Sequence, residues 1–122
     1  MVFNVLARNQ DDHTRNIAFL LEQNEPWRLS PAFDVIRSFN PSGRWTNRYQ
    51  TSVNGKRDDF TRADLATVAR PFGIKDDRDL SEQVATAVSA WPRFARAAGV
   101  RAGQLKTIAR THRLELAGTR RA

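Results

Sequence analysis

The sequence predicts a mainly α-helical domain that carries one small β-hairpin near its N-terminus. Residues 17–29 hold two short apolar runs separated by turn-forming residues, which is typical of a hairpin. Residues 61–70 begin with a helix-capping pattern, and apolar side chains then recur at helical spacing between residues 80 and 95. These three patterns favour a chain whose second half is helical.

The N-terminal part is predicted to contain the end of a helix followed by the hairpin. Residues 1–8 place Val2, Val5 and Leu6 on one stripe, but the segment is too short to be a stable helix alone, so we expect further chain upstream. The hairpin should pair residues 17–21 with residues 27–29 across a turn at 23–26. It is either an ordinary packing unit or a device that holds polar residues at its two ends, and we favour the second interpretation.

The helical half is predicted to begin at Thr61, because Thr61 and Asp64 form a variant of the capping box. This helix should run to about Arg70, and a second helix should follow the acidic residues at 76–79, which favour a helix N-terminus. Pro92 should kink or break the second helix near Trp91. Its core-facing stripe is predicted to consist of Leu80, Val84, Val88, Trp91 and Ala95, and one more amphipathic helix should contain Leu105, Ile108, Ala109 and Leu116.

Composition limits the classes of protein that the chain can belong to. The 122 residues include 20 Lys and Arg against 13 Asp and Glu, a net charge of +7 that suits an anionic partner or simply a basic surface. No cysteine is present, which excludes disulfides, thiolate metal sites and cysteine nucleophiles and fits a cytoplasmic protein. No apolar run reaches the length of a membrane span.

Residues 11–16 and Asp34 carry the polar groups that a phosphoryl-transfer site needs. Asp11 precedes Asn16 by five residues, the interval that separates the base and the metal-binding amide in protein-kinase catalytic loops. Magnesium takes one or two oxygen ligands from protein, and Asn16 and Asp34 can supply them from two sides of a cleft. The pattern predicts Asp11 as the catalytic base and Asn16 and Asp34 as magnesium ligands.

Both segments resemble a known family. Residues 9–16 match the pattern N-x-D-x-H-x-K-N except at the Lys position, and residues 31–34 follow P-x-[YF]-D, with Asp34 18 residues after Asn16. These patterns are similar to the C-terminal kinase core of the HipA toxins, and residues 53–60 and 91–95 resemble later segments of that family. Arg15 stands where the family usually has Lys, so the charge is kept while a planar fork replaces a point charge.

The resemblance implies a serine/threonine protein kinase that uses ATP and Mg²⁺, with Arg15 as a phosphate contact. It also implies a type II toxin–antitoxin system, an antitoxin partner of HipB type, a protein substrate such as an aminoacyl-tRNA synthetase, and operator DNA bound through the antitoxin complex. The family has an N-terminal lobe with a nucleotide-covering loop. The chain contains no glycine-rich loop, so we expect a kinase-like C-lobe that is inactive without such a lobe.

Under this interpretation the whole chain, residues 1–122, is one HipA-like C-terminal lobe. Residues 1–36 form the catalytic and metal-binding segment, 37–59 a loop placed like an activation segment, 60–117 the helical region and 118–122 a basic tail. The loop can contact a substrate or be simply mobile, and we favour mobility. Within it, residues 50–53 are predicted to form a short strand before a turn at Asn54 and Gly55.

The C-terminal region supports a rival interpretation from another class. From Arg93 onward there are eight Lys and Arg residues and one acid, Glu115. A basic helix of this kind can follow DNA phosphates, with Arg110 and Arg113 as candidate contacts to DNA or to a partner, or it can be a solvated face. The chain would then be a basic helical protein- or DNA-binding module without catalysis.

The two histidines are predicted to have secondary roles. His13 should orient the loop by hydrogen bonding, because a zinc site would need further ligands at suitable spacing that the sequence does not offer. His112 should lie at the surface or face a partner.

Overall fold

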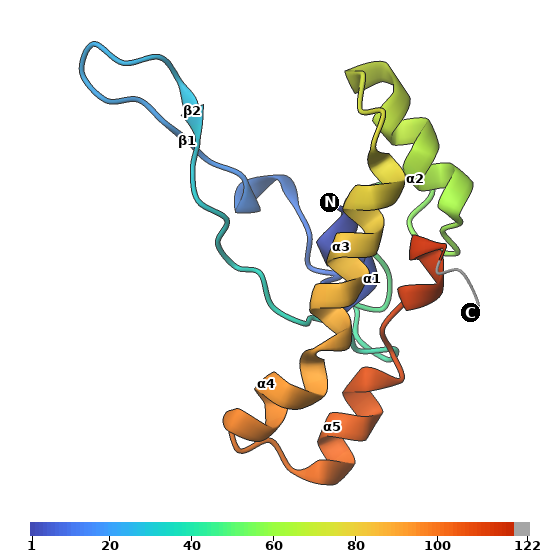
Figure 1. The fold of residues 1–122 in the computed structure, drawn as a ribbon. Helices are drawn as coiled ribbons and strands as arrows, with labels where there is room; N and C mark the ends of the chain where they lie inside the picture. Colours follow the sequence, from blue (N-terminus) through green and yellow to red (C-terminus); the bar gives the residue numbers. More distant parts are fainter. Residues whose placement is uncertain (119–122) are drawn as a thin grey trace.

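The computed structural model describes residues 1–118, and its fold is mainly helical with a small antiparallel hairpin, as the sequence predicted (Figure 1). Its elements are α1 (Val2–Ala7), η1 (Thr14–Asn16), β1 (Phe19–Leu20), β2 (Arg28–Leu29), α2 (Arg62–Ala69), η2 (Arg70–Phe72), α3 (Asp77–Ser89), α4 (Trp91–Ala97), α5 (Ala102–Ala109) and η3 (Leu114–Ala117), where η marks a 3-10 helix. Of the predicted basic tail, all residues after Gly118 lie outside the described part of the chain.

The short helix α1 lies at the centre of the helical body, where it packs against α3 (Figure 1). Its side chains Val5 and Leu6 are fully buried in the core. The Tyr49 hydroxyl lies 2.7 Å from the carbonyl oxygen of Val5, to which it can donate, and the Arg113 N–H donates to the carbonyl oxygen of Leu6 at 2.9 Å. Six residues are too few for an independent helix, so these tertiary contacts hold α1 in place.

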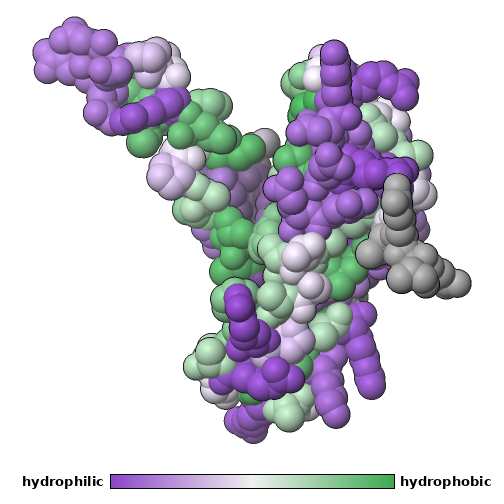
Figure 2. Space-filling view, viewed as in Figure 1, coloured by the Kyte–Doolittle hydropathy of each residue, from purple (hydrophilic) through white to green (hydrophobic). Residues whose placement is uncertain are grey.

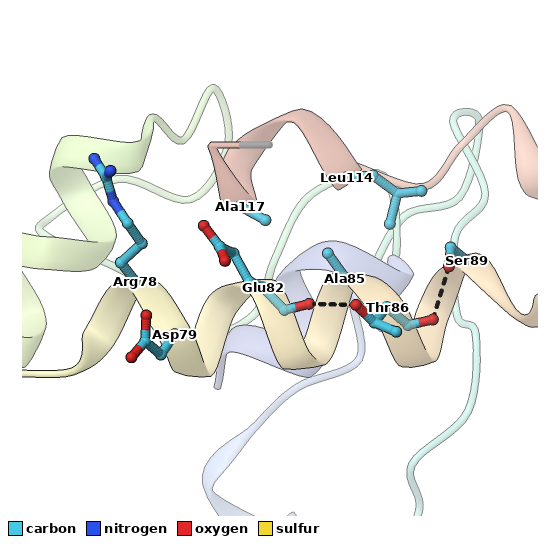
Figure 3. A pocket seen from close by; sticks show the side chains of 8 residues that line it. All are labelled: Arg78, Asp79, Glu82, Ala85, Thr86, Ser89, Leu114 and Ala117. Atoms are coloured by element: carbon cyan, nitrogen blue, oxygen red, sulfur yellow. Dashed lines mark hydrogen bonds between the residues drawn. The ribbon is translucent and has the colours of Figure 1, made fainter. Parts of the chain in front are cut away.

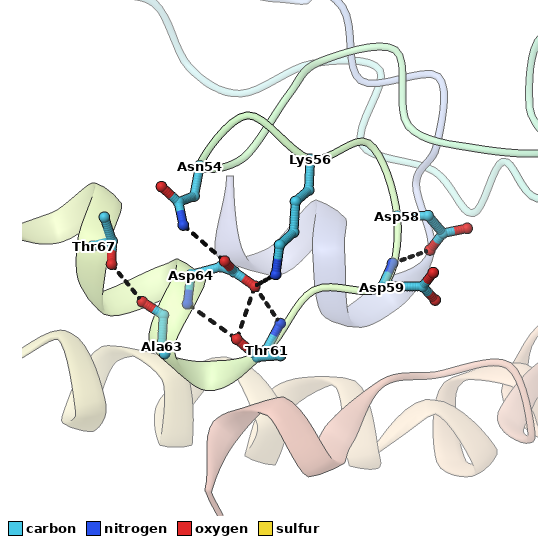
Figure 4. A network of polar contacts seen from close by, with 8 residues as sticks. All are labelled: Asn54, Lys56, Asp58, Asp59, Thr61, Ala63, Asp64 and Thr67. Atoms are coloured by element: carbon cyan, nitrogen blue, oxygen red, sulfur yellow. Dashed lines mark hydrogen bonds and ion pairs between the residues drawn. The ribbon is translucent and has the colours of Figure 1, made fainter.

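The capping box predicted for α2 is present (Figure 4). The Thr61 hydroxyl accepts from the Asp64 N–H, and the Asp64 carboxylate accepts from the Thr61 N–H at 2.7 Å. Phe60 and Leu65, which flank the cap, are both buried, as expected for a hydrophobic staple. The 3-10 helix η2 follows α2 directly, and its first turn contains Pro71.

Helices α3 and α4 meet at the predicted break, because α3 ends at Ser89 and α4 begins with Trp91 and Pro92. The predicted stripe is right for Val88 and Ala95, which are buried, but wrong for Leu80, which is 41% exposed. The face of α3 that enters the core instead contains Ser81, Ala85 and Val88. Ser81 can be buried there because its hydroxyl donates to the Asp77 carbonyl oxygen at 2.7 Å.

The C-terminal region forms two short helices rather than the single amphipathic helix that the sequence predicted. α5 contains Leu105, Ile108 and Ala109, whereas Leu116 belongs to the separate helix η3. Between them the backbone of Arg113 has φ −104° and ψ 54°, which are not helical values. Its N–H donates to the Leu6 carbonyl oxygen of α1 instead of continuing the helix. This turn brings η3 back against α3 and buries Leu116 and Ala117.

The strands β1 and β2 form an arm that extends away from the helical body (Figure 1). Phe19 pairs with Leu29 and Leu20 with Arg28, as the hairpin prediction requires. Hydrophobic surface follows the arm toward its hydrophilic tip (Figure 2). Because Phe19 and Leu29 are 60% and 65% exposed, the hairpin is not an ordinary packing unit of the core.

Residues 37–59 connect the arm to α2 without regular strands. The predicted strand at 50–53 is wrong, since only an isolated bridge joins Val53 to Lys56. The predicted turn is present, because Asn54 and Gly55 have φ values of 51° and 74°, the left-handed geometry of a tight hairpin turn. Tyr49 attaches the segment to the core, because its ring is buried there and its hydroxyl can donate to the Val5 carbonyl oxygen, and the predicted mobility of the loop stays a prediction.

No helix among residues 1–118 combines the length and the apolar character needed to cross a lipid bilayer.

Candidate functional site

The loop with the predicted catalytic residues begins from a fixed backbone. The Gln10 N–H donates to the carbonyl oxygen of Ser38 at 2.9 Å, and the Ser38 N–H donates to that of Arg8 at 3.1 Å. Asn9 and Gln10 are almost completely buried. Residues 11–16 therefore leave the core at a defined point and in a defined direction.

Asn16 is oriented by the residue that was predicted to act as the base. Its side-chain amide nitrogen donates to the backbone carbonyl oxygen of Asp11 at 3.1 Å, and its backbone N–H donates to that of His13 at 3.0 Å. The amide nitrogen is thereby occupied, which leaves the side-chain oxygen as the atom that can coordinate a cation. The five-residue spacing between Asp11 and Asn16 thus closes a small turn that holds the Asn16 side chain on the Asp11 backbone.

Asp34 has an unusual backbone conformation. Its φ is +53°, in the left-handed region that non-glycine residues seldom adopt, although Asp tolerates it better than most. Its carbonyl oxygen accepts a hydrogen bond from the Asn9 side-chain amide at 3.2 Å, and its side chain is exposed. Backbone strain of this kind often marks functional positions, because the surrounding contacts must hold the residue there.

A groove of about 390 Å³ brings the two predicted segments together. Asn16 and Asp34 both line it, although they are separated by the whole hairpin. Apolar side chains from the base of the arm, including Ile17, Leu29 and Phe33, line the rest of the same groove. Asp11 is half-buried and is not among the lining residues, whereas its neighbour Asp12 is.

Several polar residues that line this groove were not predicted as site residues, among them Asn9, Asp12 and Thr51. Thr51 lies outside both motifs, and its hydroxyl donates to the Asp12 carbonyl oxygen, which ties the loop to the segment after the arm. Asn9 and Asp12 stood inside the loop pattern and could have been found as neighbours of Asp11. No sequence signal pointed to Thr51, because the contact depends on how the chain returns from the arm.

The two remaining loop predictions have different outcomes. The predicted hydrogen bond of the His13 side chain is not found at Nδ1, which is buried without a partner among the described residues, and His13 orients the loop through its backbone oxygen instead. Arg15 is exposed next to Asn16, where its guanidinium is free to approach an anion, and its predicted phosphate contact stays a prediction.

The donor set of the groove suits Mg²⁺ better than zinc. Among residues 1–118, no group of three or more His, Cys, Asp or Glu side chains is placed to hold a metal ion. Magnesium does not need such a cage, since it binds through one or two protein oxygens and keeps several waters. The side-chain oxygens of Asn16 and Asp34, with Asp12 nearby, are hard donors of that kind.

Arg113 has a structural position that argues against its predicted contact with DNA. Only 9% of it is exposed, and its guanidinium pairs with Asp58 while lying 5.5 Å from the centre of the Phe60 ring. Burial alone would raise the pKa of Asp58, but hydrogen bonds from Arg113 and from the Asp59 N–H outweigh it and lower that pKa. Arg110, by contrast, is exposed, so its contact stays a prediction. His112 is half-buried against the Trp91 ring rather than fully at the surface.

A larger groove of about 650 Å³ lies between α3 and η3, away from the loop (Figure 3). It contains none of the predicted site residues. The hydroxyls of Thr86 and Ser89 donate to backbone oxygens of their own helix, so neither offers a free donor to a ligand (Figure 3). We place the candidate site in the groove of Asn16 and Asp34, because it is the groove that two of the predicted site residues line.

The family model of the HipA-like C-terminal domain matches residues 1–115, which includes the loop, Asp34 and nearly all of the helical region. Neither the search of curated proteins nor the search of solved structures finds a match.

Proposed function

Because the chain belongs to the family of HipA-like C-terminal domains, we propose that it is the catalytic C-lobe of an ATP-dependent kinase that phosphorylates Ser or Thr hydroxyls of a protein. One observation carries the proposal. Asn16 and Asp34 line the same groove, and hydrogen bonds fix the loop of Asp11 both to Asn16 and, through Asn9, to the segment of Asp34.

Asn16 and Asp34 would hold Mg²⁺ through their side-chain oxygens, and Arg15 would contact the phosphates of ATP. When bound, Mg²⁺ would offset the negative charge of the nucleotide phosphates. Apolar side chains such as Ile17 and Leu29 in the same groove would exclude water from the nucleotide. The exposed position of Arg15 supports its proposed phosphate contact, and the amide oxygen of Asn16 is available to Mg²⁺ because the amide nitrogen makes the hydrogen bond to Asp11.

Asp11 would act on the hydroxyl of the substrate. As the hydroxyl oxygen bonds to the γ-phosphorus of ATP, the Asp11 carboxylate takes the proton, and the bond to the bridging oxygen breaks and releases ADP. A base that serves the incoming hydroxyl must face the substrate side of the γ-phosphate rather than the nucleotide. The position of Asp11, half-buried and outside the set that lines the groove, is compatible with that task.

The biological setting that we propose comes from the family alone. The kinase would be the toxin of a type II toxin–antitoxin system, restrained by an antitoxin of HipB type that binds operator DNA. An aminoacyl-tRNA synthetase is the substrate class that this setting favours. The transfer would also need a lobe that covers the nucleotide, since the 122 residues contain no glycine-rich loop.

The test is binding of a non-hydrolysable ATP analogue, followed by NMR chemical shifts in the presence of Mg²⁺ and again with excess EDTA. We expect shifts confined to residues around the loop and Asp34, and their loss when Mg²⁺ is removed. We also expect no phosphorylation of a protein substrate by this chain alone, because the phosphates would have donors on one side only. Absence of Mg²⁺-dependent binding would favour the basic binding module, and rapid turnover by the isolated chain would contradict the proposed need for a second lobe.

A further inference from the structure

A second groove, of about 320 Å³, lies at the junction of the helices and has a different character from the candidate site. Five separate segments contribute apolar side chains to it: α1, residues 35–37, α3, α4 and α5. Its main lining residues are Phe3, Ile36, Trp91, Phe94 and Ile108. Val35 is shared with the candidate site, but Asn16 and Asp34 are not.

The floor of this groove is preformed. The Trp91 indole N–H donates to the Leu105 carbonyl oxygen at 3.1 Å, and the Trp91 ring packs edge-on against His112 with 6.1 Å between ring centres. Ile36 and Phe94 at the rim are 59% and 55% exposed. A rigid floor with large exposed apolar side chains at its edge is the usual form of a surface that binds a partner.

The residues that line the groove include one arginine and no acid. The lining residues fall within three acid-free stretches of the sequence, residues 1–10, 35–57 and 83–114. Asp34 precedes Val35 but lines the other groove. Arg37 lines this groove, and the Arg93 guanidinium lies 4.7 Å from the centre of the Phe94 ring. Among residues 1–118 neither arginine pairs with a carboxylate.

We propose that this groove binds an acidic peptide segment of a partner protein, whose large apolar side chains enter the groove and whose Asp and Glu residues meet Arg37 and Arg93. The apolar floor decides against nucleic acid as the occupant, since a phosphate backbone would gain nothing from Phe3, Ile108 and Trp91. The cationic rim decides against a neutral or basic peptide. This inference does not rest on the proposed kinase activity, because the groove shares only Val35 with that site.

The probe is a fluorescein-labelled synthetic peptide with Leu and Phe at helical spacing and Glu at the other positions, followed by fluorescence anisotropy with the 122-residue chain. Two control peptides replace either Leu and Phe by Ser or Glu by Lys. The groove variants are Ile36→Ser, Phe94→Ser and Arg37→Glu, all at exposed positions. The matched controls are Phe72→Ser and Arg70→Glu, which are exposed outside the groove. Circular dichroism of each variant verifies that it is folded.

We expect the acidic amphipathic peptide to bind, both control peptides to bind weakly, and each groove variant to lose at least ~10-fold in affinity, as hot-spot residues do. The two control variants should change affinity by less than about 2-fold, in the range of surface contacts outside an interface. Equal loss in groove and control variants, or no binding of the acidic peptide, would overturn the proposal. Binding of a labelled DNA duplex that the groove variants abolish, without peptide binding, would assign the surface to nucleic acid instead.

Discussion

The side-chain amide of Asn9 donates a hydrogen bond to the backbone carbonyl oxygen of Asp34, with 3.2 Å between the two atoms. This bond joins the start of the loop at residues 9–16 to the residue that follows the hairpin arm. Asn9 is almost completely buried, while the Asp34 side chain is exposed in the groove. A buried amide therefore fixes the backbone of the exposed acid that we propose as a magnesium ligand.

Replacing Asn9 by Ala is expected to loosen this arrangement. The Asp34 carbonyl oxygen loses its donor, so the free energy of unfolding should fall by about 0.5–1.5 kcal/mol, the usual net contribution of one hydrogen bond. Affinity for the Mg²⁺ complex of the ATP analogue should fall as well. Urea denaturation and NMR titration measure the two effects, with the exposed Asn47→Ala as the control. A loss of stability without any loss of affinity would show that Asn9 does not position Asp34.

The two aspartates of the proposed site should have separable roles. Asp34→Asn removes a negative charge from the magnesium site and should weaken binding of the metal–nucleotide complex. Asp11→Asn leaves the proposed ligands in place and removes the base, so single-turnover transfer should slow by ~10² to 10⁴ while affinity changes little. Transfer has to be measured with a nucleotide-covering lobe supplied in the same or a second chain.

The control for both variants is Asp59→Asn. Asp59 is exposed and has φ +51°, close to the +53° of Asp34, but it lies outside the groove. It should change neither binding nor transfer. If Asp11→Asn abolished binding while Asp34→Asn left binding and transfer intact, the two proposed roles would have to be exchanged.

Asp64 is expected to make the stability of the fold sensitive to acid. Its carboxylate accepts hydrogen bonds from Lys56 Nζ and Asn54 Nδ2, each at 2.8 Å, and from Thr61 (Figure 4). These bonds, the one from Lys56 first, lower the pKa of Asp64 below its ordinary value of 3.8. Because the folded pKa is the lower one, the contribution is complete above about pH 3.8 and is lost as the pH falls from there through the folded pKa.

Asp64→Asn should therefore lower the Tm by several degrees at pH 7, and the difference from the unmodified chain should shrink below about pH 3.8. Thermal unfolding followed by circular dichroism at a series of pH values measures this. Asp76→Asn is the control, since Asp76 is the N-cap residue that precedes α3 and its side chain makes no capping hydrogen bond. A difference between Asp64→Asn and the unmodified chain that stays constant down to pH 2 would show that the charge of Asp64 is not what stabilises this region.

Substitutions of Arg113 and Arg110 are expected to differ in their effect on the stability of the fold, although both residues lie in one basic stretch of the sequence. Arg113→Ala leaves Asp58 without its partner beside the Tyr49 and Phe60 rings, and should destabilise the fold by about 2–4 kcal/mol, since a partly buried ion pair is broken. Arg110→Ala should lie within about 0.5 kcal/mol of the unmodified chain, as exposed substitutions do. Urea denaturation of the two variants compares them directly. Equal stability of both would show that the buried pair contributes nothing.

The sequence alone determined the local elements whose signals lie within a few residues. The capping box of Thr61 and Asp64, the tight turn at Asn54 and Gly55, the break at Pro92 and the hairpin of β1 and β2 follow from backbone chemistry, and the structure has all four. The loop pattern and its spacing to Asp34 also predicted the family, which the match over residues 1–115 confirms. Such features need no distant contact, because each is specified by neighbouring side chains and their effect on φ and ψ.

Only the tertiary structure decided which faces are buried and which polar residues meet. Leu80 is exposed and Ser81 buried because α3 is turned toward α1 and η3, a choice that apolar periodicity does not specify. Arg113 became a core residue because its backbone bonds to α1, and Thr51 reached the loop because the chain returns from the arm beside it. These outcomes depend on contacts between residues far apart in the sequence, whose geometry is set by the packing of the whole domain rather than by any local pattern.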